Sequence, residues 1–296
     1  MKNQKESVVG ENVEKLIFCS DLHGNMTQYQ RVFDYAAKVG ADFVAFGGDI
    51  TPKDPGRRTP KLQRQFCEEE LFPVIKAFHD KAGIPVLMIM GNDDFISNKH
   101  IFDGGQAVYG YTMIDEVPYT SPGGHVFFGY TSIPSTPFIH KCWERRDLES
   151  DVGFDMREDT RIEGVYSQED ELVDYSLEIM KDKPAIETQL AEGLKDVDGD
   201  KLVLITHGPP HDTVCDVCVT GVHVGSRGIR SVIQSKQPKL TLHGHIHETV
   251  DKTGEFQDKI GESLVVTVGN DHRPDAPYII EANLSDAISV ERKALD

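Results

Sequence analysis

Seven residues of the kinds that bind metal ions occur at five separate points along the chain. Each point follows a short apolar run, as Leu16–Ser20 precedes the first pair and Leu202–Thr206 precedes a single histidine. The seven residues are Asp21, His23, Asp49, Asn92, His207, His245 and His247. Imidazole, carboxylate and amide oxygen, without thiolate, suit borderline to hard divalent ions such as Mn²⁺, Fe²⁺, Zn²⁺ or Ni²⁺. The residue types therefore predict a site for divalent cations.

The positions of these residues suggest how they come together. Short apolar runs bounded by glycine are typical of buried β-strands. Side chains at the ends of several strands can converge on one point, which side chains scattered along helices rarely do. In the pairs Asp21/His23 and His245/His247, alternate residues of an extended segment point to the same side. Gly244 lets the backbone pass close to an ion without a Cβ in the way.

The blocks that carry these residues resemble those of the calcineurin-like metallophosphoesterase superfamily in order and spacing. The resemblance covers residues 16–250 and is carried by Asp21-Leu22-His23, Gly48-Asp49, Gly91-Asn92-Asp93-Asp94, His207 and Gly244-His245-Ile246-His247. A later stretch, His207–Pro210 followed by His223–Ser226, is similar to the bacterial and archaeal Icc-related phosphoesterases.

The resemblance implies a dinuclear metal-dependent phosphoesterase. It implies two ligand sets joined by a shared carboxylate: Asp21, His23 and His247 for one ion, Asn92, His207 and His245 for the other, and Asp49 as the bridge. Two divalent ions roughly 3.5–4 Å apart can hold a bridging hydroxide that attacks phosphorus in line. The ions and their histidine and asparagine ligands would stabilise the charge that develops on the oxygens.

One candidate catalytic position departs from the family pattern. After Asn92, where the family has a histidine that assists the leaving group, this chain has Asp93. An aspartate acts as a general acid only if its pKa is raised, and two nearby cations favour the ionised carboxylate. We therefore expect an incomplete replacement and substrates with good leaving groups, such as aryl esters or phosphoanhydrides. The alternative is that Asp93 accepts a hydrogen bond from a substrate hydroxyl and sets specificity.

Two other functions remain open from the sequence. A non-catalytic metal-binding scaffold that binds protein partners is supported by the change at Asp93, but the complete ligand set argues against it. A nuclease is disfavoured by the net charge of −18, because nucleic-acid binders need stripes of lysine and arginine. The longest basic cluster, Lys53–Arg64, is interrupted by acids and prolines, and within it Arg57 and Arg58 could reach a substrate phosphate. We expect a small phosphorylated substrate.

Composition bears on location and partners. No apolar run approaches the roughly 18 residues of a membrane span, and residues 1–9 are polar, unlike a signal peptide. The 5 cysteines have no framework spacing, which favours a reducing cytoplasm. Cys215 and Cys218 are expected to be structural thiols, with a redox pair or half a zinc site as alternatives. We expect no membrane partner, and a homo-oligomer is compatible with the composition.

The expected elements predict the fold class. Strands and helices alternate first, with strands at residues 15–20, 42–46 and 84–90 and helices at residues 27–39 and 62–81. Pro73 should kink or divide the second helix. Residues 107–131 then form short β-like runs. This order predicts an α/β sandwich of two sheets with outer helices, and the resemblance implies the four-layer αββα form with two mixed sheets. We expect a single domain over residues 1–296.

Residues 134–199 are strongly acidic and are expected to form a helical insert. Ser167-x-x-Asp170, followed by Leu172, Tyr175 and Ile179, indicates a capped amphipathic helix. A second helix is expected at residues 185–195. The insert is expected to pack on a sheet, with a partial lid or an oligomer contact as the functional alternative.

Three loop positions are weaker candidates. His211, near His207, and His272-Arg273, after the strand at 264–268, could face the ions, although lone loop histidines are more often solvated. The turn Gly225-Ser226, before a helix expected to reach residue 235, offers backbone N–H groups for an anion. Ser226 is equally suited to be an ordinary N-cap.

Overall fold

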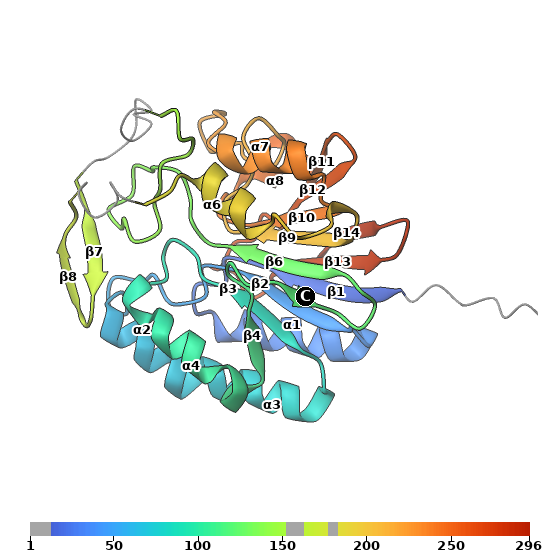
Figure 1. The fold of residues 1–296 in the computed structure, drawn as a ribbon. Coiled ribbons are helices and arrows are strands. Elements are labelled where there is room, and N and C mark those ends of the chain that lie inside the picture. The colour runs from blue at the N-terminus through green and yellow to red at the C-terminus, as the bar shows by residue number, and fades with distance from the viewer. Residues whose placement is uncertain (1–12, 152–162, 177–182) are drawn as a thin grey trace, which may run out of the picture.

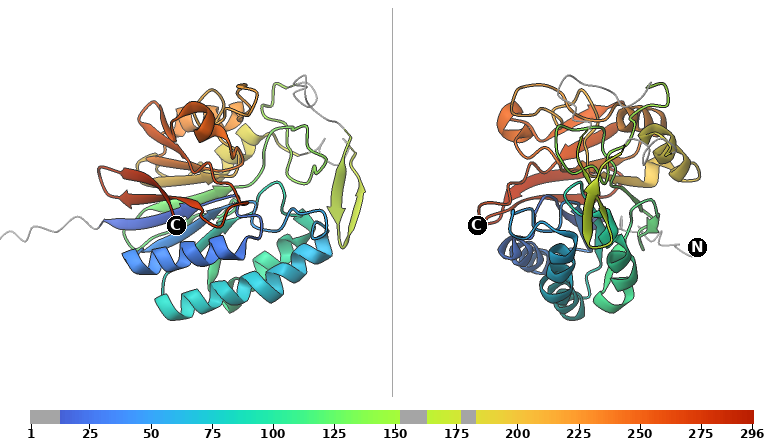
Figure 2. Two further views of the ribbon diagram at one scale, coloured as in Figure 1. Left: turned by 180° about the vertical axis from the view of Figure 1, so that it is seen from behind. Right: turned by 90° about the vertical axis from the view of Figure 1, so that its left-hand side faces the viewer.

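The computed structural model describes residues 13–151, 163–176 and 183–296. The polar segment 1–9 and Ile179, which entered the expectations above, lie outside these residues. Two six-stranded sheets stack face to face, with helices on both outer faces (Figures 1 and 2). The predicted four-layer α/β fold with two mixed sheets is confirmed.

In the first sheet, four strands pair in parallel, and two further strands join one side through antiparallel pairings. Its order is β14 (Ser289–Ala294), β13 (Tyr278–Leu284), β1 (Glu14–Cys19), β2 (Phe43–Gly47), β3 (Val86–Ile89) and β4 (Tyr111–Met113). Strands β1 to β4 are parallel. Their carboxyl ends therefore lie at one edge of the sheet.

The second sheet repeats this plan. Its order is β11 (Gln257–Ile260), β12 (Ser263–Thr267), β10 (Leu240–His243), β9 (Leu202–Thr206), β6 (Val126–Tyr130) and β5 (Tyr119–Thr120). Strands β6, β9, β10 and β12 are parallel. Fully buried parallel strands require cover on both faces, and the packing of the layers provides it.

Alternating side chains build three apolar cores. In β1, Ile17 packs towards the helices while Leu16 and Phe18 pack against the second sheet. Helices α1 (Met26–Val39), α2 (Pro60–Phe66), α3 (Phe72–Ala82) and α4 (Lys99–Tyr109) cover the first sheet. Helices α6 (Ile186–Gly193) and α7 (Arg227–Lys236) cover the second, and the short α8 (Thr249–Thr253) follows β10. Both helices expected beyond residue 180 are present.

The helical stretch expected at 62–81 is divided, as the proline predicted. A π-helical turn, Cys67–Leu71, separates α2 from α3, and Pro73 lies in the first turn of α3. The π-helical turn lies just before Pro73, whose ring and missing N–H are incompatible with an ordinary α-helical hydrogen bond at that point. The division occurs before Pro73, not at it.

In its described residues, the insert contains a β-hairpin as well as a helix, which corrects the prediction of a helical insert. The expected helix from Ser167 is wrong, because β7 (Val165–Gln168) and β8 (Glu171–Asp174) form an antiparallel hairpin. Glu169, at the turn between the two strands, has a left-handed conformation with φ 52°. This conformation interrupts the right-handed backbone that an α-helix requires. The spacing of Leu172 and Tyr175 suits either element, so tertiary contacts decided between them.

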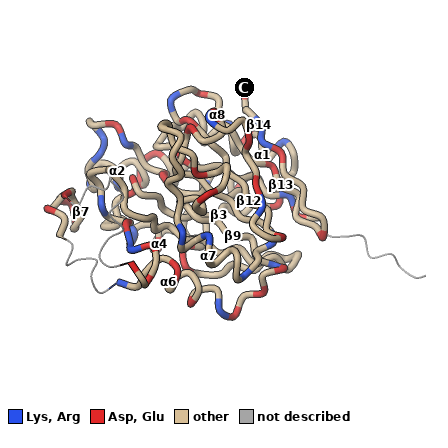
Figure 3. Tube along the Cα trace, turned by 90° about the horizontal axis from the view of Figure 1, so that it is seen from above, with Lys and Arg blue, Asp and Glu red and all other residues tan. Residues whose placement is uncertain are grey.

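Over the described residues, charge is distributed without a basic stripe. Lysines and arginines alternate with more numerous acids along the Cα trace (Figure 3). Among the described helices, none has the length and apolar character needed to cross a membrane.

Candidate metal centre

The candidate residues follow the carboxyl ends of five parallel strands. Asp21 comes after β1, Asp49 after β2 and Asn92 after β3 in the first sheet, whereas His207 and His245 follow β9 and β10 in the second. Backbone hydrogen bonds join the loops that follow neighbouring strands: Asp21 N–H, after β1, donates to Gly48 O, after β2, at 3.0 Å. Across the sheets, Nδ1 of His207 lies 2.9 Å from Gly47 O. The two strand edges therefore meet at one point.

The backbone at this point is strained. Asp21, His23, Asp49 and His245 all have left-handed conformations, with φ of 60°, 44°, 51° and 69°. Such conformations cost of order 1–3 kcal/mol each in non-glycine residues and cluster at functional sites. They turn the side chains inward directly after the strands end.

Close approach of the loops requires glycine at position 48. Gly48 has φ 100°, and a Cβ there would lie 2.6 Å from Met90 O and 2.7 Å from Nδ1 of His207. A side chain at this position would push the β2 loop away from the β3 loop and from His207.

Four side chains form the first part of the cluster. Potential ligand atoms of Asp21, His23, Asp49 and His247 all lie within 4.8 Å of one another. Nε2 of His23 lies 3.3 Å from Nε2 of His247 and 3.5 Å from Oδ2 of Asp49. Nε2 of His247 also lies 3.5 Å from Oδ1 of Asp21. Imidazole nitrogens and carboxylate oxygens directed at one small volume are a donor set that fits a divalent ion.

The second part of the cluster lies on the other side of Asp49. Oδ1 of Asp49 lies 3.5 Å from Nε2 of His207, which in turn lies 2.9 Å from Oδ1 of Asn92. A carbonyl oxygen can only accept, so the contact with Gly47 O places a proton on Nδ1 of His207. In a neutral imidazole, Nε2 and the Asn92 oxygen are then both acceptors. Two facing acceptors fit a shared cation. The ring of His245 lies 5.1 Å from that of His207.

Burial favours the neutral imidazole form of His23 and His245. Burial, followed by the charge of Lys53, lowers the pKa of His23 well below its ordinary value. Burial, followed by His207, lowers the pKa of His245 to about 3. Neutral imidazole is the form that binds metal. Burial and the neighbouring Asp93 raise the pKa of Asp49 well above its ordinary value, so a cation would relieve the cost of ionising this carboxylate.

Asp94 holds the surrounding loops. Its buried carboxylate accepts hydrogen bonds from the backbone of Ile50 (3.0 Å), Thr51 (2.8 Å) and Gly91 (2.8 Å), and from the Thr51 hydroxyl (2.6 Å). The indole of Trp143, in the insert, donates to Asp94 O at 2.7 Å. The insert therefore packs directly on the loop that carries Asn92.

A cleft of about 380 Å³ opens beside the cluster. Asp93 lines it with its carboxylate paired to the Arg58 guanidinium, while its N–H donates to Oδ1 of Asp49 at 2.7 Å. Nζ of Lys53 lies 3.1 Å from Nε2 of His23. Phe138 and Ile139 of the insert form an apolar side, exposed by 49% and 43%. The cleft thus combines two cations with an apolar surface.

Of the weaker candidates from the sequence, some line the cleft and others do not. Arg58 lines the cleft, but Arg57 pairs with Glu70 at 2.6 Å. His211 is absent from the described residues that line the cleft, and its ring lies 6.0 Å from that of His223.

Ser226 is an N-cap. Its hydroxyl accepts from Ile229 N–H at 2.9 Å, and the Asp147 carboxylate takes the N–H groups of Arg227 (2.7 Å) and Gly228 (3.0 Å). The start of α7 therefore binds the protein's own carboxylate. All five cysteines, including Cys215 and Cys218, are free thiols.

The comparisons with known proteins agree with this geometry. The sequence profile described as calcineurin-like phosphoesterase matches residues 14–249. The chain belongs to this family. It is therefore a phosphoesterase, a hydrolase of phosphate ester bonds.

Solved structures share the fold at low sequence identity. The TT1561 protein of Thermus thermophilus is 16% identical with a TM-score of 0.57, over 96% of this chain and 100% of that chain. A dimetal phosphatase from Danio rerio is 11% identical with a TM-score of 0.52, over 96% of this chain and 99% of that chain. A search of curated proteins by sequence finds no match.

Lys53 is a residue of the cleft that sequence reasoning missed. In the sequence it is only the start of a dispersed basic segment, yet in the fold it reaches His23. The available signal was its position, four residues after Asp49 on the same strand-end loop.

Proposed function

We propose that this phosphoesterase uses two divalent ions joined by Asp49. Asp21, His23 and His247 would hold one ion, and Asn92, His207 and His245 would hold the other. The position of Asp49 carries this proposal, because its two carboxylate oxygens each lie 3.5 Å from Nε2 of a different histidine, His23 on one side and His207 on the other. Manganese, iron, zinc and nickel all suit these ligands.

When bound, two such ions would lower the pKa of a bound water and polarise the phosphoryl oxygens. Lys53 and Arg58 are placed to bind the phosphoryl oxygens at the mouth of the cleft, since both line it. Asp93 positions Arg58 through their ion pair and orients Asp49 through its N–H. Because the Asp93 carboxylate is engaged by the Arg58 guanidinium, we assign Asp93 a positioning role and not proton donation to the leaving group.

The favoured substrate is a small phosphate ester with an aryl or other flat apolar group. A cleft of about 380 Å³ is within the size range of small-molecule sites. Phe138 and Ile139 offer a surface for the organic part of the substrate. The charge of −18 opposes long polyanions. A phosphodiester of nucleotide size would also fit this cleft.

The test is metal-dependent hydrolysis of p-nitrophenyl phosphate and bis-p-nitrophenyl phosphate after loading with Mn²⁺, Fe²⁺, Ni²⁺ or Zn²⁺. Asp49→Asn should lower the metal-dependent rate by about 100-fold or more, because a shared ligand is lost. Asp34→Asn, at an exposed position of α1, is the matched control and should retain the rate. Turnover that survives both chelation and Asp49→Asn would refute the proposal.

A further inference from the structure

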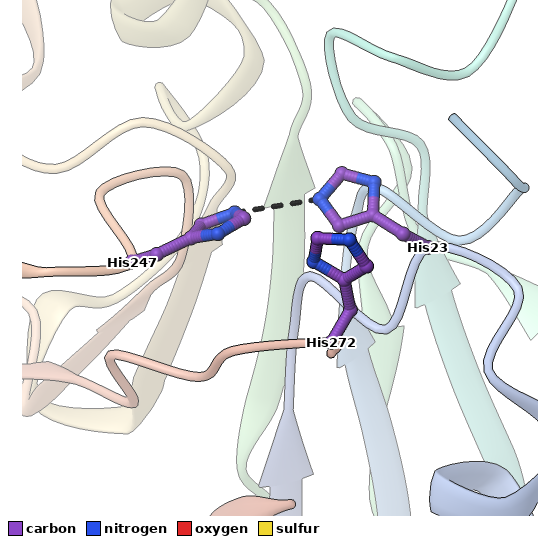
Figure 4. A group of neighbouring side chains, drawn as sticks. All are labelled: His23, His247 and His272. Carbon is purple, nitrogen blue, oxygen red and sulfur yellow. Dashed lines mark hydrogen bonds between the residues drawn. The ribbon is translucent and has the colours of Figure 1, made fainter. Parts of the chain in front are cut away.

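A third histidine lies against the first part of the metal cluster. The rings of His272 and His23 are 4.7 Å apart, and those of His272 and His247 are 5.9 Å apart. Potential ligand nitrogens of the three residues all lie within 4.8 Å of one another. Figure 4 shows the three rings converging from separate loops.

His272 occupies a strand-end position like those of the other candidates. It follows β12, which pairs in parallel with β10, the strand that leads to His245 and His247. The carboxyl ends of parallel neighbours lie at the same edge of a sheet. The loop after β12 therefore reaches the edge at which the candidate ligands gather.

The start of α1 holds this loop in place. The Asn25 side chain donates to His272 O at 2.8 Å, and the buried Gln28 side chain donates to Asp271 O at 2.8 Å and Pro274 O at 2.6 Å. Asn25 also caps α1, accepting from Gln28 N–H at 3.2 Å. The loop is thus fixed to the segment that follows Asp21 and His23.

Among the described residues, one nitrogen of the His272 ring lacks a hydrogen-bond partner. Its Nδ1 is buried and, in the part of the chain that the structure describes, makes no hydrogen bond. The nearest carboxylate, Asp271, is 3.7 Å from Nδ1 and is engaged by the Arg273 guanidinium. A buried unpartnered nitrogen is costly, and a metal ion would satisfy the ring.

We propose that His272 is a further ligand of the ion held by Asp21, His23 and His247, an inference that rests on the proposed dinuclear centre. This ion would then have three imidazoles and two carboxylates around it. Imidazole-rich sites suit zinc, nickel, iron or copper, whereas magnesium and calcium prefer oxygen. His272 would bias the first ion towards the former group and leave the second ion's ligands unchanged.

The assignment can be tested by Co²⁺ titration of the full-length chelated protein, followed by its visible absorption. His272→Asn should weaken one of the two binding steps on the order of tenfold or more and spare the other. Asp275→Asn, at an exposed position of the same loop, is the matched control and should bind as wild type. His247→Asn tests the dinuclear centre itself.

A second variant separates a ligand from a structural residue. His272→Cys should bind Co²⁺ with a thiolate-to-cobalt charge-transfer band in the near ultraviolet, absent from wild type because no cysteine belongs to the potential-ligand clusters of the described residues. Wild-type affinity in His272→Asn together with no such band in His272→Cys would overturn the assignment. If His247→Asn is weakened in the same experiment, the dinuclear centre stands. If His247→Asn also binds two ions as wild type does, the dinuclear centre is wrong as well.

Discussion

Replacement of Arg58 by methionine should lower activity in a way that replacement of its neighbour Arg57 does not. Both belong to the loop before α2, yet the fold sends them in different directions. The Arg58 side chain is 25% exposed, lines the cleft and pairs with Asp93. Arg57 is 43% exposed, pairs with Glu70 and lies 5.2 Å from the Phe66 ring centroid. Methionine keeps much of the apolar stem and removes the charge.

The expected magnitude follows from these environments. A hydrogen bond between a charged donor and a phosphoryl oxygen contributes about 1.5–3 kcal/mol. Arg58 belongs at the lower end, because it is partly solvated and already shared with Asp93. A loss of about 1.5 kcal/mol in the transition state is roughly tenfold in kcat/KM. Arg57→Met should stay within about twofold, since an exposed ion pair contributes little.

The assay is steady-state hydrolysis of p-nitrophenyl phosphate by metal-loaded protein, with thermal unfolding to show that both variants fold. Adding Asp93→Asn gives a double-mutant cycle. If Asp93 acts by holding Arg58, the two substitutions should be clearly less than additive. Equal losses in Arg57→Met and Arg58→Met, or an unchanged rate in Arg58→Met, would refute the placement of Arg58 at the phosphate.

Three further outcomes are expected. Asp94→Asn should lower the free energy of unfolding by about 2–3 kcal/mol in urea denaturation, because a buried carboxylate with several hydrogen-bond donors is lost. The exposed Asp103→Asn is the control and should leave the free energy of unfolding unchanged. Equal stability of the two variants would contradict the role of Asp94 in holding the loops. Burial, followed by the charge of Arg58, lowers the pKa of His140 to about 4, against an opposing effect of the Asp93 carboxylate. In the unfolded chain a histidine has a pKa of about 6.5, so it binds a proton at a higher pH than His140 does in the fold. The contribution of His140 to the free energy of unfolding is therefore complete above about pH 6.5. It is lost as the pH falls towards 4, by up to about 1.4 kcal/mol per pH unit. His140→Gln should flatten the fall of unfolding free energy over this range and the exposed His100→Gln should not, whereas parallel curves for wild type and His140→Gln would exclude the effect. Phe138→Ser should raise KM for phenyl phosphate about three- to tenfold, through loss of about 1 kcal/mol of apolar contact, and leave KM for glycerol phosphate unaffected. Val108→Ser, at an exposed apolar residue of α4 outside the cleft lining, is the control. An equal change for both substrates would argue against an aryl surface.

Local sequence determined where the candidate ligands enter the structure. Apolar runs such as Leu202–Thr206 are buried on both faces and become parallel strands, so the first polar residue after each lies at a strand's carboxyl end. That rule needs only the hydrophobic pattern and the chain direction. It located Asp21, Asp49, Asn92, His207 and His245, together with the strands that precede them.

Local patterns did not determine the insert. The segment around Ser167 satisfied a helix-capping pattern, yet it pairs as a hairpin. Short segments with apolar residues at mixed spacing fit either period, and long-range contacts decide between them. One such contact is the bond from Ser97 N–H to the Ser167 hydroxyl, at 3.1 Å.

Only the tertiary structure decided which charged and polar loop residues reach the cluster. Arg57 and Arg58 are adjacent and identical in type, but one pairs with Glu70 and the other with Asp93. His211 and His272 were equivalent loop histidines in the sequence, and only His272 lies against His23. Loop side chains take their direction from anchors distant in sequence, as Asn25 holds the backbone of His272. The hydrophobic periodicity of the sequence determines the strands. It carries no information about the loop contacts that form beyond the strand ends.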